Sequence, residues 1–113
     1  MAVSFQSIAQ QCATFYADDG IATGIPCMME ANNKVCPCDT AEPFIGVILD
    51  QRAGLATVAL TGFVEVTFSG TAPTLGYCSM AANGNGGVQC LEGEKKYLVV
   101  SVDENSNKAV ILL

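Results

Sequence analysis

Histidine and tryptophan are both absent from the 113 residues of this chain. Without histidine, nucleophilic triads lack their usual general base, and the usual catalytic zinc sites lack a ligand. Without tryptophan, an aromatic platform for a sugar or another small ligand depends on three tyrosines. For each of them we expect a core or sheet-face role instead: Tyr16, Tyr77 and Tyr97. The sequence therefore predicts a protein that is not an enzyme, with no catalytic residue and no cofactor.

Charge is also scarce, at 14% of the residues, and the eleven acids outnumber the five bases to give a net charge of −6. Such a chain repels phosphate backbones and anionic membrane surfaces, so we expect neither nucleic acid nor membrane as a partner. The acids do not form a calcium loop or a glycosidase pair, and we interpret them as solvated turn residues. The nine acids interpreted in this way are Asp18, Asp19, Asp39, Glu42, Asp50, Glu92, Glu94, Asp103 and Glu104.

No apolar run approaches the ~18 residues that a membrane helix requires. Residues 1–10 (MAVSFQSIAQ) lack the basic and apolar regions of a signal peptide, so we expect synthesis in a cytoplasm. The length fits one domain, and half of the residues are apolar, which excludes a disordered chain.

The six cysteines are Cys12, Cys27, Cys36, Cys38, Cys78 and Cys90. In a reducing compartment we expect them to be packed thiols rather than disulfides. Cys36 and Cys38 would point the same way on a strand and reach one ion, with Cys27 as a third ligand and Asp39 or Glu30 as a fourth. Zinc sites usually bring two close pairs, however, and Pro37 places this segment at a strand edge or end. We predict no metal site and keep a small metal-binding module as the alternative.

Cys78 and Cys90 flank a glycine-asparagine loop at residues 83–87 (NGNGG). If the flanking segments pair, a short loop places Cys78 opposite Cys90 or one residue off register. We predict a cross-strand pair of thiols, because a disulfide would need oxidising conditions.

Alternation of apolar and polar residues dominates the chain and predicts eight or so strands. The strands are expected at residues 11–17, 24–30, 43–50, 55–70, 76–82, 96–103 and 108–113. The parity of residues 55–70 does not break at Gly62, which favours one long strand bent there; a two-residue turn at Thr61 and Gly62 is the alternative. Residues 5–13 could form one or two helical turns. We find no internal repeat in the sequence.

The roughly ten-residue spacing of the strands predicts an all-β, single compact barrel-like domain or a folded-over sheet. We assign residues 1–10 to an N-terminal arm and residues 11–113 to the β domain. Phe5 in the arm and Phe63 on the more polar face of the long strand are candidates for protein–protein contact, with core packing as the competing interpretation.

The order of the segments resembles that of a known family. A GIPCMM strand precedes PFIGVILD; ATVALTGFVEVTFSGTAPTLG, an ANGNGG loop and YLVVSVDENSNKAVILL then follow, so that the match covers roughly residues 20–113. The pattern is similar to that of small phage and prophage proteins that decorate or cement the viral head, of the lambdoid head decoration kind. The cysteines are not part of it.

The resemblance implies a β-barrel-like or β-clip domain with a flexible N-terminal arm, which forms a homotrimer and binds the major capsid protein at the outer capsid surface. The arm would make this contact through Val3, Phe5 and Ile8. The resemblance thus implies a virion structural protein, made in the bacterial cytoplasm and located on the capsid. A small ligand-binding β module remains an alternative.

Overall fold

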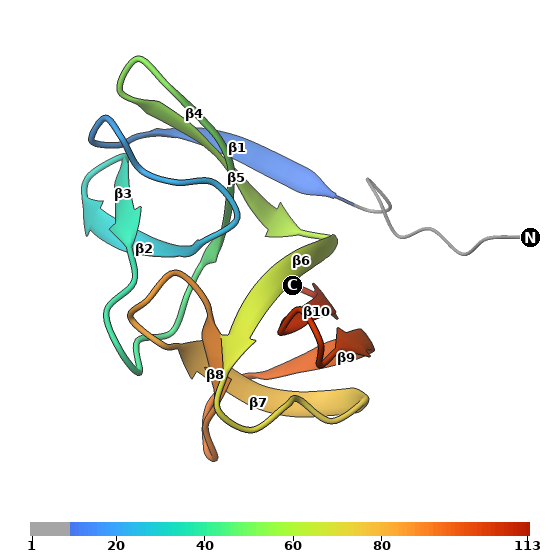
Figure 1. Cartoon of the computed structure of the whole chain (residues 1–113). Helices are drawn as coiled ribbons and strands as arrows, with labels where there is room; N and C mark the ends of the chain where they lie inside the picture. Colours follow the sequence, from blue (N-terminus) through green and yellow to red (C-terminus); the bar gives the residue numbers. More distant parts are fainter. Residues whose placement is uncertain (1–9) are drawn as a thin grey trace, which may run out of the picture.

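Ten β-strands and no helix make up residues 10–113, the part of the chain described by the computed structural model (Figure 1). The prediction of an all-β fold is confirmed. The helical turns considered for residues 5–13 are wrong where they can be checked, because Gln11 to Ala13 lie in the first strand. Among the described residues there is no helix that could cross a membrane.

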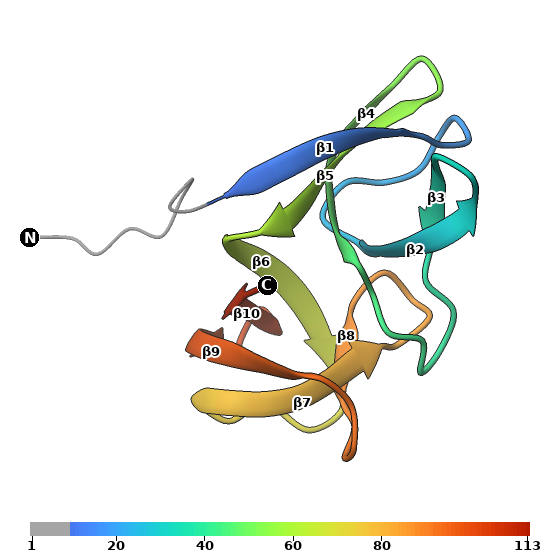
Figure 2. The same cartoon turned by 180° about the vertical axis from the view of Figure 1, so that it is seen from behind.

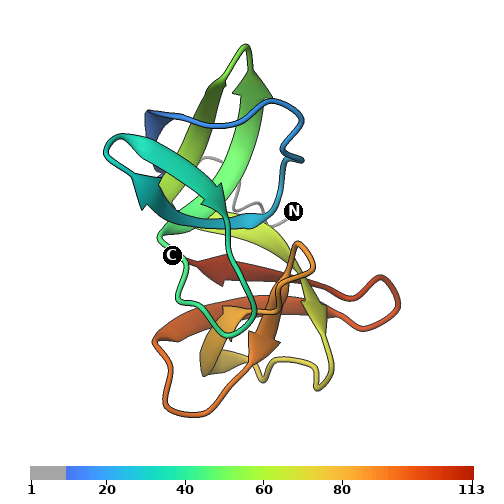
Figure 3. The same ribbon diagram turned by 90° about the vertical axis from the view of Figure 1, so that its left-hand side faces the viewer.

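The strands close into two five-stranded barrels, so that the predicted barrel-like closure occurs twice. Barrel 1 contains β1 (Gln11–Tyr16), β2 (Pro26–Ala31), β3 (Lys34–Pro37), β4 (Gly46–Arg52) and β5 (Leu55–Thr61). Barrel 2 contains β6 (Phe63–Ser69), β7 (Gly76–Ala82), β8 (Val88–Cys90), β9 (Lys96–Asp103) and β10 (Lys108–Leu112). Figure 3 shows barrel 1 above barrel 2. Figure 2 shows the two barrels from behind the view of Figure 1.

The two barrels have the same topology. The strand order around barrel 1 is β1-β3-β2-β4-β5. The order around barrel 2 is β6-β8-β7-β9-β10, so each strand has the same place as the strand numbered five lower in barrel 1. Each barrel closes through one parallel pair, β1 with β3 and β6 with β8, and the remaining pairs are antiparallel. The chain is therefore a structural repeat, although its sequence shows none.

Gly62 joins the barrels. Residues 55–70, predicted as one long strand bent at this glycine, are two strands: β5 closes barrel 1 and β6 begins barrel 2. The predicted bend is present and the alternative, a hairpin, is not, because β5 and β6 do not pair. Gly62 has a φ of 99°, and a Cβ there would lie 2.6 Å from the Cα of Gln10. Glycine is needed for both reasons. The C-terminus returns to the same joint, where Leu113 N donates to Gly62 O at 3.0 Å.

Barrel 1 has a small core of buried residues without a buried aromatic ring: Ala17, Cys27, Val35, Ile48, Ala56 and Val58. A second and larger cluster fills barrel 2 and extends into barrel 1. Phe44, in the loop before β4, enters this cluster and stacks on Tyr97 of β9, with ring centroids 4.8 Å apart. The same loop is tied to the end of β7, since Ala41 N donates to Ala82 O at 2.8 Å. The two barrels thus share one core.

Candidate interaction surface

A row of large apolar side chains crosses the outer face of barrel 2. Tyr77 on β7 lies opposite Leu98 on β9, Leu98 lies opposite Leu112 on β10, and Leu112 lies opposite Phe63 on β6. Residues that oppose one another in a sheet project from the same face, so these four form a continuous line across four strands. We call Tyr77, Leu98, Leu112 and Phe63 the apolar row.

The apolar row is open to solvent at one end and partly covered along the rest. Tyr77 is 72% exposed, whereas Leu98, Leu112 and Phe63 are half-buried. Leu75, which is 67% exposed and just precedes β7, adds to the open end. Large exposed apolar side chains that adjoin one another are typical of protein–protein contact surfaces, and tyrosine is enriched there.

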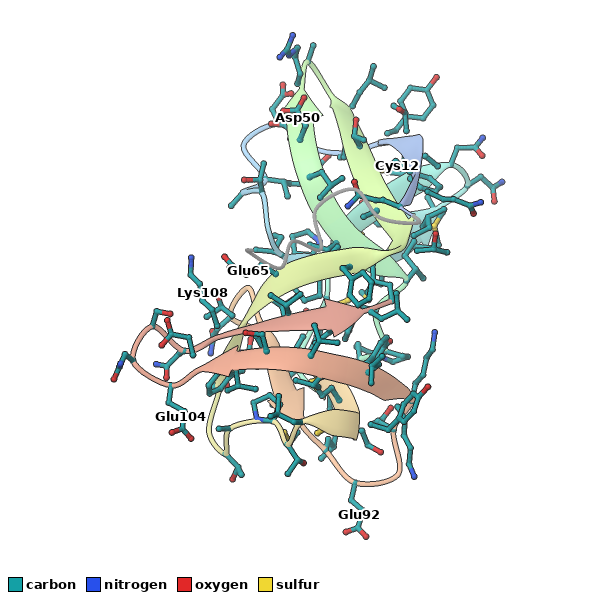
Figure 4. All side chains as sticks on the ribbon, turned by 90° about the vertical axis from the view of Figure 1, so that its right-hand side faces the viewer. Cys12, Asp50, Glu65, Glu92, Glu104 and Lys108 are labelled. Carbon is teal, nitrogen blue, oxygen red and sulfur yellow. The ribbon has the colours of Figure 1, made fainter. Side chains whose placement is uncertain are left out.

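Charged side chains lie beside the row rather than within it. Figure 4 looks onto β6, β10 and β9 and labels Glu65 and Lys108, whose carboxylate and ammonium groups are 3.4 Å apart. At another margin of the same face, Lys96 of β9 lies opposite Ser79 of β7. A surface with an uncharged centre and a charged margin has the composition of a protein interface.

A shallow groove of about 400 Å³ between the barrels adjoins the row at Phe63. Its lining residues are Gln10, Thr23, Gly24, Val47, Ile48, Leu49, Phe63, Val64 and Glu65. Val47, Ile48 and Val64 are buried and form its floor, while Leu49 on the rim is 38% exposed. Gln10, the first described residue, is one of the lining residues of this groove.

The arm residues predicted to contact the capsid lie outside the described residues: Val3, Phe5 and Ile8. Phe63, the other candidate, is on the outer face of β6, as its position in the alternation predicted. The partners of Phe63 in the row could not be found from the sequence, because they lie on three later strands, and Leu112, which is directly opposite Phe63, is 49 residues further along the chain.

The structure does not gather the three thiols considered for a metal. Cys27 lies opposite Pro37 and Met28 lies opposite Cys36, so Cys27 and Cys36 project from different faces of the β2–β3 pair. Cys38 follows the end of β3 and belongs to the core shared by the barrels. Within residues 10–113, no group of three or more cysteines, histidines or acids is placed to hold a metal ion.

The local environment keeps these thiols protonated. Burial, reinforced by the neighbouring Cys36, raises the pKa of Cys27 to about 12, and burial also raises that of Cys38 to about 12. Cys27 Sγ donates to Gly46 O at 3.6 Å. Since a thiolate is the form that binds metal and attacks electrophiles, the arrangement favours packed, unreactive thiols.

The other predicted pair does meet. The sulfurs of Cys78 and Cys90 are 3.5 Å apart, which confirms the cross-strand pair of thiols. The predicted register is wrong, because Met80 rather than Cys78 lies opposite Cys90. Ala82 pairs with Val88, so residues 83–87 form the connecting loop, in which Asn83 Oδ1 accepts from the backbone N–H of Asn85 and of Gly87.

The tyrosines divide between core and sheet faces. Tyr97 is buried, and Lys95 Nζ lies 5.1 Å from its ring centre. Tyr16 and Tyr77 are exposed on the outer faces of barrel 1 and barrel 2. The acids behave as solvated turn residues where they can be followed; Asp103, for example, accepts from the backbone N–H of Asn105 and Ser106 and has a lowered pKa because of hydrogen bonds to both.

Neither a protein-family model nor a curated protein matches the sequence.

Proposed function

We propose that this protein is a non-enzymatic virion structural protein, which decorates and stabilises a phage or prophage capsid by binding the major capsid protein. The observation that carries the proposal is the apolar row, an uncharged line of large side chains on a rigid sheet. A cement protein performs no chemistry and acts by burying surface between neighbouring subunits. The order of the sequence segments, similar to that of head decoration proteins, supplies the kind of partner.

In this proposal the protein makes two different contacts, one with other copies of itself and one with the capsid. The apolar row packs against another copy of the chain in a homotrimer, because a closed ring covers a face that a monomer leaves in water. The arm, with Val3, Phe5 and Ile8, binds the major capsid protein. Three arms on one trimer bind a symmetric capsid with avidity, so that each single contact can be weak.

The charge of the chain suits this location. With a net charge of −6, the protein is repelled by packaged DNA, while its contact surfaces carry little charge. In the proposal the protein is made in the bacterial cytoplasm and ends on the outer surface of the capsid.

The test is sedimentation of the full chain with procapsids and with expanded heads, assembled from the major capsid protein of the phage or prophage that encodes the chain. The wild-type chain is expected to pellet with one of these forms. A chain with Val3, Phe5 and Ile8 all changed to Ser should lose capsid binding and remain a trimer by light scattering. Failure of the wild-type chain to bind capsids at every stage of maturation would contradict the proposal.

The apolar row is tested by a matched pair of tyrosines. Tyr77→Ser should convert the trimer to monomer and weaken capsid binding through lost avidity, because Tyr77 is the most exposed member of the row. Tyr16→Ser removes an exposed tyrosine of barrel 1, 62% exposed, and should change neither property. If the two variants have the same oligomeric state and the same capsid binding, the apolar row is not the trimer contact.

A further inference from the structure

Among the described residues, the thiols of Cys78 and Cys90 lie in contact with each other. Cys78 lies on β7 and Cys90 on β8, and their sulfurs are 3.5 Å apart. Formation of a disulfide would bring the two sulfurs to about 2.05 Å. We infer that Cys78 and Cys90 are a modification site, at which a low-molecular-weight disulfide such as oxidised glutathione converts the native dithiol into an intramolecular disulfide.

The surroundings allow the reaction. Both side chains are half-buried at the margin of the shared core, so a small disulfide has access to them. The backbone contacts of the sulfurs are long, 3.6 Å from Cys90 Sγ to Thr71 O and 3.8 Å from Cys78 Sγ to Ser79 O. Weak contacts of this kind leave the two sulfurs able to turn toward each other.

The strand that carries Cys90 is also lightly constrained. β8 has three residues, paired with β7 at three positions and with β6 at two. Cys90 is opposite Met80, so Cys78 is its diagonal neighbour on the same face, and closing the bond requires a small shift of β8 along β7. A short strand can make this shift without disturbing the longer β7–β9 and β9–β10 pairs.

The chemistry balances as two thiol–disulfide exchanges. Burial, followed by the hydrogen bond with Cys78, raises the pKa of Cys90 to about 11, so the first attack is assigned to Cys78. The Cys78 thiolate attacks a sulfur of oxidised glutathione, forming a mixed disulfide and releasing one glutathione thiolate. The second cysteine thiolate attacks the protein sulfur of the mixed disulfide and releases the second glutathione. The two cysteines are oxidised, the glutathione disulfide is reduced, and the two thiol protons leave with the two glutathione molecules.

The chain offers a direct assay. Cleavage after Arg52 and Lys95 yields residues 53–95, a tryptic peptide whose only cysteines are Cys78 and Cys90. Cleavage after Lys34 and Arg52 yields residues 35–52, whose only cysteines are Cys36 and Cys38, and this peptide is the internal control. Exposed Cys12 is first changed to Ser to prevent disulfides between chains.

The folded Cys12→Ser protein is incubated with oxidised glutathione, alkylated in denaturant and digested. Peptide 53–95 should resist alkylation and lose the mass of two hydrogens, while peptide 35–52 is fully alkylated. The midpoint of thermal unfolding should rise by on the order of 5 °C over the reduced protein, because the bond restricts the unfolded chain. Cys78→Ser and Cys90→Ser, each in the same background, should abolish both the mass change and the thermal shift.

Three results would overturn the inference. The first is full alkylation of peptide 53–95. The second is a glutathione adduct that persists on Cys78 or Cys90 without resolving. The third is a disulfide that forms only after the protein has been unfolded, since the inference concerns the native pair. None of these results bears on capsid binding, so this inference and the proposed function can fail separately.

Discussion

Barrel 1 and barrel 2 share a strand plan but use the same outer positions in different ways. Their fourth and fifth strands pair in the same register, including a bulge: Leu49 is the extra residue in barrel 1 and Val100 is the extra residue in barrel 2. Because the registers match, each member of the apolar row has a counterpart in barrel 1. The counterparts of Tyr77, Leu98, Leu112 and Phe63 are Pro26, Val47, Ala59 and Cys12.

The central counterparts are small and covered, whereas the row residues are large and open. Val47 is 1% exposed and Ala59 is 0% exposed, and both belong to the cluster that extends into barrel 2. Leu98 and Leu112 occupy the same positions in barrel 2 and remain half-exposed. The centre of this face is thus covered within the chain in barrel 1, at Val47 and Ala59, and only partly covered in barrel 2, at Leu98 and Leu112. This contrast supports a second copy as the partner of the apolar row.

The largest loss of stability is expected when the Phe44 ring, which connects the two barrels, is removed. Phe44→Ala should lower the free energy of unfolding by about 3–5 kcal/mol, because it empties a buried site and removes the stacking on Tyr97. Urea denaturation measures the loss. Ile48→Ala, inside barrel 1 alone, is the matched control and should cost about 2–5 kcal/mol with a single transition. If Phe44→Ala gives a single transition of unchanged midpoint, the ring does not couple the barrels.

The joint between the barrels is the next site to test. Gly62→Ala should cost about 2–3 kcal/mol, because alanine is strained at this positive φ and its Cβ would press on the backbone of Gln10. Gly70→Ala, with a φ of 73° and no atom within 4 Å of the new Cβ, isolates the conformational part and should cost about 1 kcal/mol. Chemical denaturation of both variants gives the difference, and equal losses would mean that the contact with Gln10 is unimportant.

The bounds of the longer strands could be predicted from the sequence, but the strand pairings that close the two barrels could not. The bounds of β7 and β9 agree with the predicted residues 76–82 and 96–103, because the alternation there is clear and turn residues flank it. Gly62 was recognised as a bend from parity alone. β3 and β8 have four and three residues, too few for a periodic pattern, yet they supply the parallel pairs that close the barrels. A single pairing such as Tyr16 with Lys34 leaves no trace in composition.

The candidate surface was harder to predict for the same reason. Phe63 was singled out because it stands on a polar face, but Leu98 and Leu112 look like core residues when each strand is read alone. Their exposure follows from barrel closure, which directs Val99 and Ile111 inward and leaves their neighbours outside. Likewise Cys78 and Cys90 were expected to meet, but their register depended on the turn geometry that Asn83 sets.

Each of the two cores contains a buried thiol, Cys27 in barrel 1 and Cys38 in the shared cluster. The dependence of the free energy of unfolding on alkaline pH therefore tests both cores. Burial raises the pKa of each from 9.0 to about 12, so between these values the unfolded chain has lost protons that the folded chain retains. The free energy of unfolding is therefore expected to be intact below pH 9 and to fall as pH rises, by about 1 kcal/mol per thiol by about pH 10.

Cys27→Ala and Cys38→Ala should each make this decline shallower, as measured by urea denaturation at a series of pH values. Tyr97, whose pKa burial raises from 10.0 to about 12, adds a further decline that begins one pH unit higher. A free energy of unfolding that stays constant from about pH 8 to about pH 10.5 would show that the thiols are not held in a dry core.

The smallest effect is expected at the outer-face positions where barrel 1 has Tyr16 opposite Leu55 and barrel 2 has Thr67 opposite Lys108. Lys108 pairs with Glu65 at 3.4 Å, but their side chains are 49% and 60% exposed, and water screens such pairs. Lys108→Met should therefore change the free energy of unfolding by no more than about 0.5 kcal/mol, and the difference should vanish in about 1 M salt. Glu65→Gln is the control, with an equally small effect expected. A loss of about 2 kcal/mol for either variant would show that this margin of barrel 2 is held by charge, and the apolar row would then not be the only organised feature of that face.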